Sequence, residues 1–579
     1  MAIFWMFPKL KKFFPSYLVN HQTNDPQASL PHWLQGLTLG AVTIASIVLP
    51  FNKQTLAQTL YFLYPPIKEP LRVESLDIFA REGEINRNLG FFLDLARTNE
   101  EAQLKFREAL NTPAALEPLL VSRFFNSNLG EEILTRVGDT IQIEGGRNGK
   151  YALRGALVAA AFDDEGLSLI NFFRKLPTNI QFDLQKILEI SQSTEKAVAA
   201  TKLFSEVVIP QLSAAEAAAA EPVNFADLRD LRERGGHSVK ERKWTLTDKS
   251  RERSFHVDLY QPARSQRDNT PVLIISHGLG STTEEFAPIA QHLASYGFVV
   301  AVPQHIGSDS EQKDALFSGL SREVFLTSEF IDRPLDISYV IDELERRNLE
   351  EFDGKLVLDK VGVFGHSFGG YTALAIAGAT IDFDHLEREC TIGEGRLNTA
   401  LLLQCQALDL ERQEYNFRDE RVVAVLGHNP VNRTIFGPQG LSSIQIPILL
   451  GAGSYDPATP FVYEQLDSFT WLTSANKYLM LQEGQTHIDL STIDGGMSEV
   501  IDSVEEIVLP ETQLLQDYSH ATVLAFAEVY VVNDPDYLPY IQSSYLNYLS
   551  QGQKFKTYLI SEDSSEKLVD EIAKSKFED

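Results

Sequence analysis

Cysteine is scarce in this chain of 579 residues, which has only Cys390 and Cys405. No Cys-x-x-Cys pair and no Cys/His cluster is present, so the sequence has no zinc-binding pattern. We expect neither a metal nor a cofactor. No long internal repeat is visible, and two domains are expected because the chain is too long for one ordinary core.

Basic residues are also under-represented, because 51 Lys and Arg stand against 80 Asp and Glu. The resulting formal net charge of -29 argues against nucleic acid, or anionic lipid headgroups, as the main partner. The apolar fraction of 44% and the charged fraction of 23% are typical of a soluble globular protein.

Residues 1–57 have the pattern of a targeting segment. A basic start precedes an uncharged apolar run from Leu34 to Leu49, and Thr55-Leu56-Ala57 offers small residues for cleavage. The run is shorter than the ~20 apolar residues that a membrane span needs, and the region before it is long for a signal peptide. We therefore expect a signal peptide, with export to a periplasm, a lumen or the outside. The alternatives are an uncleaved anchor that associates with a membrane, or a misplaced start of the sequence.

Apolar periodicity divides the remaining chain. Residues 58–212 carry apolar residues at helical spacing, which predicts a helical domain. Residues 213–237 begin with an Ala-rich stretch and are interpreted as a linker. From 238 to 550, strands alternate with helices, which predicts an α/β domain with a mostly parallel sheet and helices on both faces. Residues 381–420 form an insertion in this domain, and 551–579 are a charged C-terminal tail.

The α/β domain is organised around Gly365-His366-Ser367-Phe368-Gly369, which lies between a strand-like and a helix-like run. Strand, Gly-x-Ser-x-Gly and helix is the pattern of a nucleophile elbow. Because the turn is very tight, Gly365 and Gly369 are needed where side chains would clash. The turn directs the N–H of Phe368 toward a developing oxyanion, so we predict that Ser367 is a nucleophile.

Two further residues follow later strands in the order that such an elbow requires, first an acid and then a histidine. Asp456 follows an apolar strand ending at Gly451, and His487 follows the next strand. Carboxyl ends of parallel strands are where these sheets place their sites. We predict that Ser367 attacks an acyl carbon, His487 transfers the proton and Asp456 holds the imidazole. The weaker candidates are Asp489 and Asp494 for the acid, and His428 and His520 for the base.

An oxyanion hole needs a second donor beside the N–H of Phe368, and in this arrangement it comes from the loop after the third strand. That strand here ends in Ser276-His277-Gly278-Leu279-Gly280, so the N–H of Leu279 is the candidate. We interpret His277 and His305 as structural residues of the loops.

The motifs resemble the dienelactone hydrolase and platelet-activating-factor acetylhydrolase branch of the alpha/beta hydrolases, over about residues 270–490. The likeness is densest in 276–310 and 365–370. The whole chain is similar to a cyanobacterial hydrolase family in which such a domain follows an N-terminal helical domain. The resemblance implies the alpha/beta-hydrolase fold and a serine carboxylic-ester hydrolase, esterase- or lipase-like, acting on a small-molecule or lipid ester.

One departure from that branch concerns the acid. Platelet-activating-factor acetylhydrolases place it after the strand that precedes Gly427, where this chain has Gly427-His428-Asn429-Pro430 without a carboxylate. Asp456 matches the position found in dienelactone hydrolases instead, which weakens any transfer of phospholipid specificity.

Two alternative functions and the redox state of the two cysteines stay open at this point. The same triad would support acyl transfer to an alcohol other than water, and the fold would also serve as a non-catalytic binding scaffold. Cys390 and Cys405 would close a loop of about 15 residues as a disulfide in an oxidising compartment, or would be two reduced, buried thiols.

Overall fold

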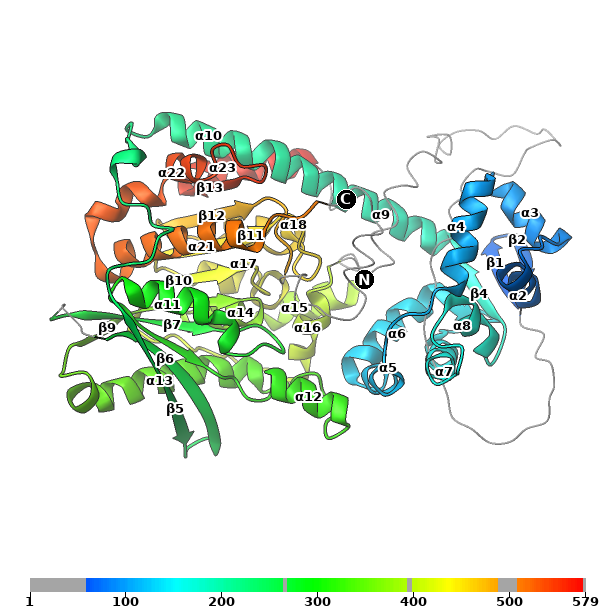
Figure 1. Cartoon of the computed structure of the whole chain (residues 1–579), viewed down its shortest axis with the longest axis horizontal. Coiled ribbons are helices and arrows are strands. Elements are labelled where there is room, and N and C mark those ends of the chain that lie inside the picture. The colour runs from blue at the N-terminus through cyan, green and yellow to red at the C-terminus, as the bar shows by residue number, and fades with distance from the viewer. Residues whose placement is uncertain (1–58, 264–267, 393–397, 488–507, 576–579) are drawn as a thin grey trace. The chain divides into compact units, whose positions relative to one another are not determined.

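The computed structural model describes four stretches of the chain (Figure 1): residues 59–263, 268–392, 398–487 and 508–575. The predicted targeting segment, 1–57, lies outside them, as do Asp489 and Asp494. Contacts divide the chain into two compact units, with the boundary between Lys196 and Ala197; Leu316–Glu323 groups with the first unit. In the described stretches, no helix is both long enough and apolar enough for a bilayer crossing.

The first unit is mainly helical, as predicted, and also contains a four-stranded sheet in the order β2-β1-β4-β3. Apolar side chains such as Leu76, Leu157 and Phe172 form its core. Its strands are β1 (Thr59–Tyr64), β2 (Ile67–Arg72), β3 (Ile141–Ile143) and β4 (Ile180–Asp183). Its helices are α2 (Val73–Glu82), α3 (Arg87–Leu95), α4 (Glu100–Asn111), α5 (Pro118–Phe125), α6 (Asn128–Thr140), α7 (Lys150–Ala161), α8 (Leu169–Lys175) and the start of α9 (Leu184–Leu203).

The second unit is built on a nine-stranded sheet in the order β13-β12-β11-β10-β9-β7-β8-β6-β5. The six strands from β12 to β8 in this order run parallel, and the strands outside them pair antiparallel. The mostly parallel sheet is therefore confirmed. The strands are β5 (Val239–Asp248), β6 (Arg253–Pro262), β7 (Thr270–Ser276), β8 (Val299–Pro303), β9 (Leu356–His366), β10 (Val422–His428), β11 (Ile448–Gly453), β12 (Lys477–Gln482) and β13 (Thr557–Ser561).

Helices cover both faces of this sheet, so its central strands are buried on both sides. Along β7, Val272 and Ile274 pack into a core with α13 and α14, whereas Leu273 and Ile275 pack into a second core with α11 and α21. The helices after Ala197 are α10 (Ile209–Ala219), α11 (Ala287–Ser295), α12 (Ser310–Ser318), α13 (Glu329–Glu351), α14 (Phe368–Ile376), α15 (Phe383–Ile392), α16 (Leu401–Gln404), α17 (Arg433–Ser442), α18 (Phe461–Glu464), α19 (Leu466–Trp471), α21 (Thr512–Ala527), α22 (Ser543–Leu549) and α23 (Ser565–Ser575).

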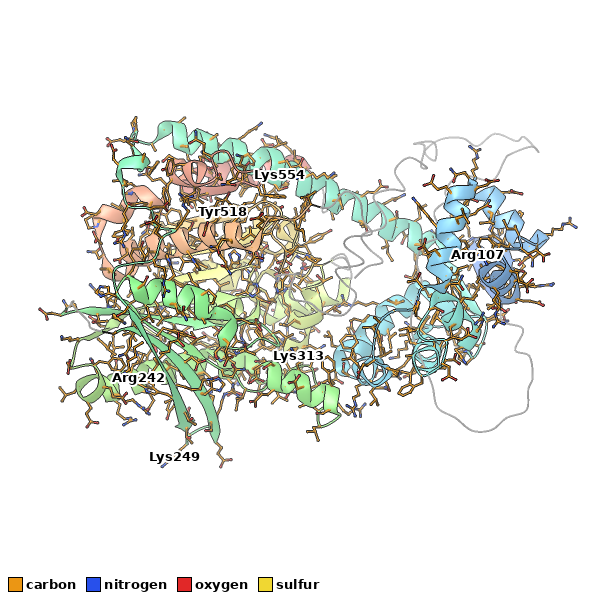
Figure 2. The ribbon with its side chains drawn as sticks, in the orientation of Figure 1. Arg107, Arg242, Lys249, Lys313, Tyr518 and Lys554 are labelled. Atoms are coloured by element: carbon orange, nitrogen blue, oxygen red, sulfur yellow. A yellow bond between two sulfur atoms is a disulfide. The ribbon has the colours of Figure 1, made fainter. Side chains whose placement is uncertain are left out.

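One edge strand of the sheet, β5, carries charged side chains. Arg242 on β5 and Lys249 in the following turn carry charge along the outer edge (Figure 2). Charged side chains on an edge strand oppose edge-to-edge association.

Two segments differ from the domain limits expected from sequence. The Ala-rich stretch is not a separate linker, because α10 packs on α22 and β13. The Glu216 carboxylate accepts hydrogen bonds from the Ser543 hydroxyl and the Ser561 N–H, both at 2.9 Å. The expected charged tail, 551–579, supplies strand β13 and helix α23 instead, with Ile560 and Leu568 buried in the core.

Candidate active site

Ser367 occupies the sharp turn between β9 and α14. Its φ of 57° and ψ of −117° lie in a region that a residue with a side chain rarely adopts, at a cost of order 1–3 kcal/mol. The turn closes because its neighbours lack side chains. A Cβ on Gly365 would overlap the carbonyl oxygen of Gly369, and a Cβ on Gly369 would overlap that of Ser276. The elbow glycines are therefore steric requirements of this turn.

The structure brings the three predicted site residues together. His487 Nε2 lies 2.8 Å from Ser367 Oγ, and His487 Nδ1 lies 2.7 Å from Asp456 Oδ2. An ionised carboxylate only accepts hydrogen bonds, so Nδ1 carries the imidazole proton and Nε2 accepts from the serine hydroxyl. This arrangement places a ring nitrogen with a free lone pair against the Ser367 hydroxyl.

The loop after β11 holds the Asp456 carboxylate in place. Its Oδ1 accepts the N–H groups of Ala458 and Thr459, at 2.8 and 2.9 Å. Its Oδ2 accepts the Thr459 hydroxyl at 2.8 Å in addition to the His487 ring. Asp456 is only 5% exposed, so these donors replace the water that a buried carboxylate loses.

Leu279 and Phe368, the two expected oxyanion donors, belong to chain segments next to Ser367. A Cβ placed on Gly278 would lie 3.3 Å from the Cβ of Ser367, so the loop after β7 runs directly beside the serine. Phe368 is the first residue of α14, where N–H groups have no intrahelical partner. In the described part of the chain, the N–H of Leu279 has no hydrogen-bond acceptor either.

Two histidines, His366 and His428, lie near His487. The His366 ring lies 4.8 Å from it, and burial, with His487 and His428 nearby, holds the pKa of His366 well below its usual range. Burial likewise lowers the pKa of His428 to about 4. His428 hydrogen-bonds with the Gln485 side chain and His520 stacks on His292, whereas the bond to Ser367 belongs to His487.

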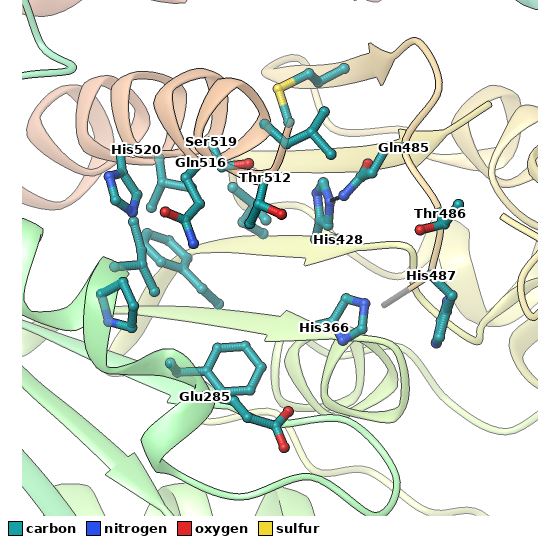
Figure 3. Close-up of a pocket in the computed structure, with 18 of the residues that line it drawn as sticks. Glu285, His366, His428, Gln485, Thr486, His487, Thr512, Gln516, Ser519 and His520 are labelled. Atoms are coloured by element: carbon teal, nitrogen blue, oxygen red, sulfur yellow. Dashed lines mark hydrogen bonds between the residues drawn. The ribbon is translucent and has the colours of Figure 1, made fainter. Parts of the chain in front are cut away.

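An apolar cavity of about 470 Å³ begins beside His487 and extends between α11, α21 and the sheet. In Figure 3, His487 lies at one end and His520 lies toward the other. Glu285, Gln516 and Ser519 add polar groups to the lining. Most of the wall is apolar, from Ile275, Phe286, Pro288, Ile289, Phe364, Leu426, Met480, Leu509, Pro510, Leu515 and Val523.

The two cysteines form a disulfide, Cys390–Cys405, in the insertion after α14. Thr399 lies between the two cysteines in the sequence. Its hydroxyl donates to the carbonyl oxygens of Pro457 and Ala458, in the loop that carries Asp456. The insertion therefore contacts the loop that carries Asp456.

Among the described residues, one group has side chains of the kinds that can bind a metal ion: His256, Asp258 and Glu284. The ammonium of Lys243 lies 3.3 Å from the Asp258 carboxylate and 3.2 Å from that of Glu284. Lys243 thus already supplies positive charge to this group.

Two family models match the chain. Residues 57–183 match a family described as an alpha/beta hydrolase of unknown function (DUF1400), and residues 230–393 match the chlorophyllase family. The second match includes Leu279 and Ser367 but ends before Asp456 and His487. A comparison with curated proteins found no match.

The fold and both family matches identify the protein as an α/β hydrolase. The class expected from the sequence motifs is thus confirmed. The narrower resemblance to dienelactone hydrolases stays a prediction.

The sequence did not predict one residue at the site, Arg333. Arg333, on α13, contacts the loop that holds Leu279 and the ring of Phe368. Its sequence context is an ordinary amphipathic helix, and a fully buried arginine there is visible only once the fold brings its partners together.

Proposed function

We propose that the protein is a serine carboxylic-ester hydrolase that works through an acyl-enzyme. The observation that carries the proposal is the continuous hydrogen-bonded series from Asp456 through His487 to Ser367. Nε2 of His487 takes the Ser367 proton as Oγ attacks the ester carbon, and Asp456 stabilises the imidazolium that forms. His487 then gives that proton to the departing alkoxide, and a water repeats the sequence to release the acid.

The N–H groups of Leu279 and Phe368 are proposed to bind the negative oxygen of each tetrahedral intermediate. Both belong to backbone that is held by buried elements, so they need little reorganisation when charge develops. The neutral state of His366 and His428 supports the same mechanism, because it adds no like charge beside the imidazolium of His487.

The cavity beside His487 supports an apolar group in the substrate. Its volume is within the usual range for small-molecule sites, and its wall is mostly hydrophobic. Since His487 protonates the leaving oxygen, the part of the ester nearest this ring is the alcohol. We therefore assign the cavity to an apolar alcohol portion.

A fluorophosphonate probe and a series of p-nitrophenyl esters test the proposal. The folded wild-type protein should be labelled and should hydrolyse the esters, whereas Ser367→Ala should lose both activities, with a fall in rate of several orders of magnitude. Ser338→Ala, which removes a hydroxyl bound to Asp419, is the matched control. Absence of labelling and turnover in folded wild type would refute the proposal, and transesterified products with added alcohols would indicate acyl transfer.

A further inference from the structure

Arg333 lies at the start of α13 and is completely buried. Its Nη1 donates to the carbonyl oxygen of His277 at 2.7 Å, and its Nη2 donates to that of Gly278 at 3.4 Å. Its guanidinium carbon also lies 4.3 Å from the centre of the Phe368 ring, within the range of a cation–π contact. One side chain therefore contacts both segments that supply the proposed oxyanion donors.

The contacts with the loop have a consequence for the direction of the Leu279 N–H. The peptide between Gly278 and Leu279 is planar and trans, so its C=O and N–H point in opposite directions. Because the Gly278 oxygen faces the Arg333 guanidinium, the Leu279 N–H faces away from it. A rotated peptide would present the oxygen to the oxyanion and repel it.

His277 reinforces the same orientation. Its Nε2 accepts the backbone N–H of His305 at 2.9 Å, so the ring proton is on Nδ1. Nδ1 lies 2.8 Å from the Gly278 oxygen and donates to it. Complete burial, followed by the charge of Arg333, keeps the pKa of His277 well below its usual range, so this tautomer is neutral.

Arg333 is itself fixed from the other side. Its Nε donates to the Ser308 hydroxyl at 2.9 Å, and that hydroxyl donates to Glu329 at 2.7 Å. The Ser308 carbonyl oxygen accepts the N–H of Gly280 at 2.8 Å, which ties the far end of the oxyanion loop to the same position. Only the planar, forked guanidinium can reach the two carbonyls, Ser308 and the Phe368 ring together.

We propose that Arg333 is a positioning residue for the oxyanion hole, which holds the Leu279 peptide and the Phe368 turn in the orientation that binds the tetrahedral intermediate. This inference rests on the proposed ester hydrolysis. It assigns no contact between Arg333 and the substrate.

Arg333→Lys tests the inference, with Arg253→Lys as the matched control. Arg253 is a buried arginine of the same charge cluster that pairs with Glu329 and Asp336, at 2.8 and 2.9 Å, but contacts neither the loop carbonyls nor Phe368. For Arg333→Lys we expect kcat to fall about 10- to 100-fold with KM within about 2-fold, because the lost orientation matters only in the transition state. Arg253→Lys should keep kcat within about 2-fold of wild type.

A second readout separates positioning from general loss of structure. A trifluoromethyl ketone, whose adduct with serine carries an oxyanion, should bind Arg333→Lys more weakly in proportion to kcat, whereas a methyl ketone of the same chain length should not. If Arg333→Lys does not fold, Ser308→Ala replaces it, with an expected fall in kcat of about 3- to 10-fold. Equal kcat in the Arg333 and Arg253 variants, or a change in KM alone, would overturn the inference. Wild type without esterase activity would instead refute the proposed function.

Discussion

The carboxylate of Asp456 lies 2.7 Å from Nδ1 of His487, 31 positions further along the chain. The two residues meet because β11 and β12 are parallel neighbours, so the loops after them leave the sheet at the same edge. Thr459 strengthens the contact from behind, since its N–H and hydroxyl both donate to Asp456. The Asp456 carboxylate is therefore held in one orientation.

Asp456→Asn should lower kcat by about 10³- to 10⁴-fold, because the amide favours the wrong imidazole tautomer. Thermal unfolding should change little, as the new side chain has the same shape. Asp467→Asn is the control: this buried acid pairs with Arg433 at 3.0 Å, and its variant should retain activity. Steady-state kinetics with one p-nitrophenyl ester measures kcat for both variants. An Asp456→Asn protein with the kcat of wild type would show that Asp456 is not the acid of the triad.

The elbow and the strand pattern could be predicted because their signals are local. A glycine must stand at positions 365 and 369 wherever a serine occupies this turn, and buried parallel strands appear as short apolar runs. The order of acid and histidine after successive strands then follows from the fold class.

The remaining features could not be predicted because they depend on distant partners. Arg333 is 56 positions from His277, and nothing near it in the chain indicates its burial. The boundary between the units was misplaced because the Ala-rich α10 has no strong apolar stripe, although it packs on β13. Strand β13 has the sequence TYLIS, whose β-branched and aromatic residues favour a strand. The charged residues around it instead suggested a solvent-exposed tail.

Isomeric esters should reveal which part of the substrate enters the apolar cavity. Octyl butanoate and butyl octanoate contain the same atoms, but only the first has a long alcohol chain. We expect the first to have the higher kcat/KM, because each methylene buried in the cavity contributes about 0.8 kcal/mol. Equal values, or a preference for the second, would contradict the assignment.

Val523→Phe should reduce that preference by filling the cavity from α21. Leu514→Phe is its control, because Leu514 lies on the same helix outside the lining. Val523→Phe should lower kcat/KM for octyl butanoate more than for butyl octanoate. Leu514→Phe should change kcat/KM for the two esters by the same factor. Rates for both esters with both variants complete the test.

Reduction of the Cys390–Cys405 disulfide should lower the free energy of unfolding by ~3 kcal/mol, because the two cysteines are 15 positions apart and the unfolded chain regains the loop entropy. Urea titrations with and without reductant measure the difference. A Cys390→Ser, Cys405→Ser double variant should unfold at the lower midpoint in both conditions. Intact mass before and after reduction with alkylation checks that the bond is present in the purified protein.

Acid should destabilise the protein through its buried histidines. Burial lowers the pKa of His428 to about 4 in the folded state, while the unfolded chain has the usual value near 6.5. Above 6.5 both states are neutral and the contribution of His428 to stability is complete. Between pH 6.5 and pH 4 the unfolded state binds a proton at this histidine and the folded state does not. The free energy of unfolding therefore decreases by up to ~3 kcal/mol as the pH falls. His428→Gln has no such proton, so its urea midpoint should fall less between pH 7 and pH 4.5 than that of wild type. Parallel curves for the two proteins would show that His428 is not the source of the acid sensitivity.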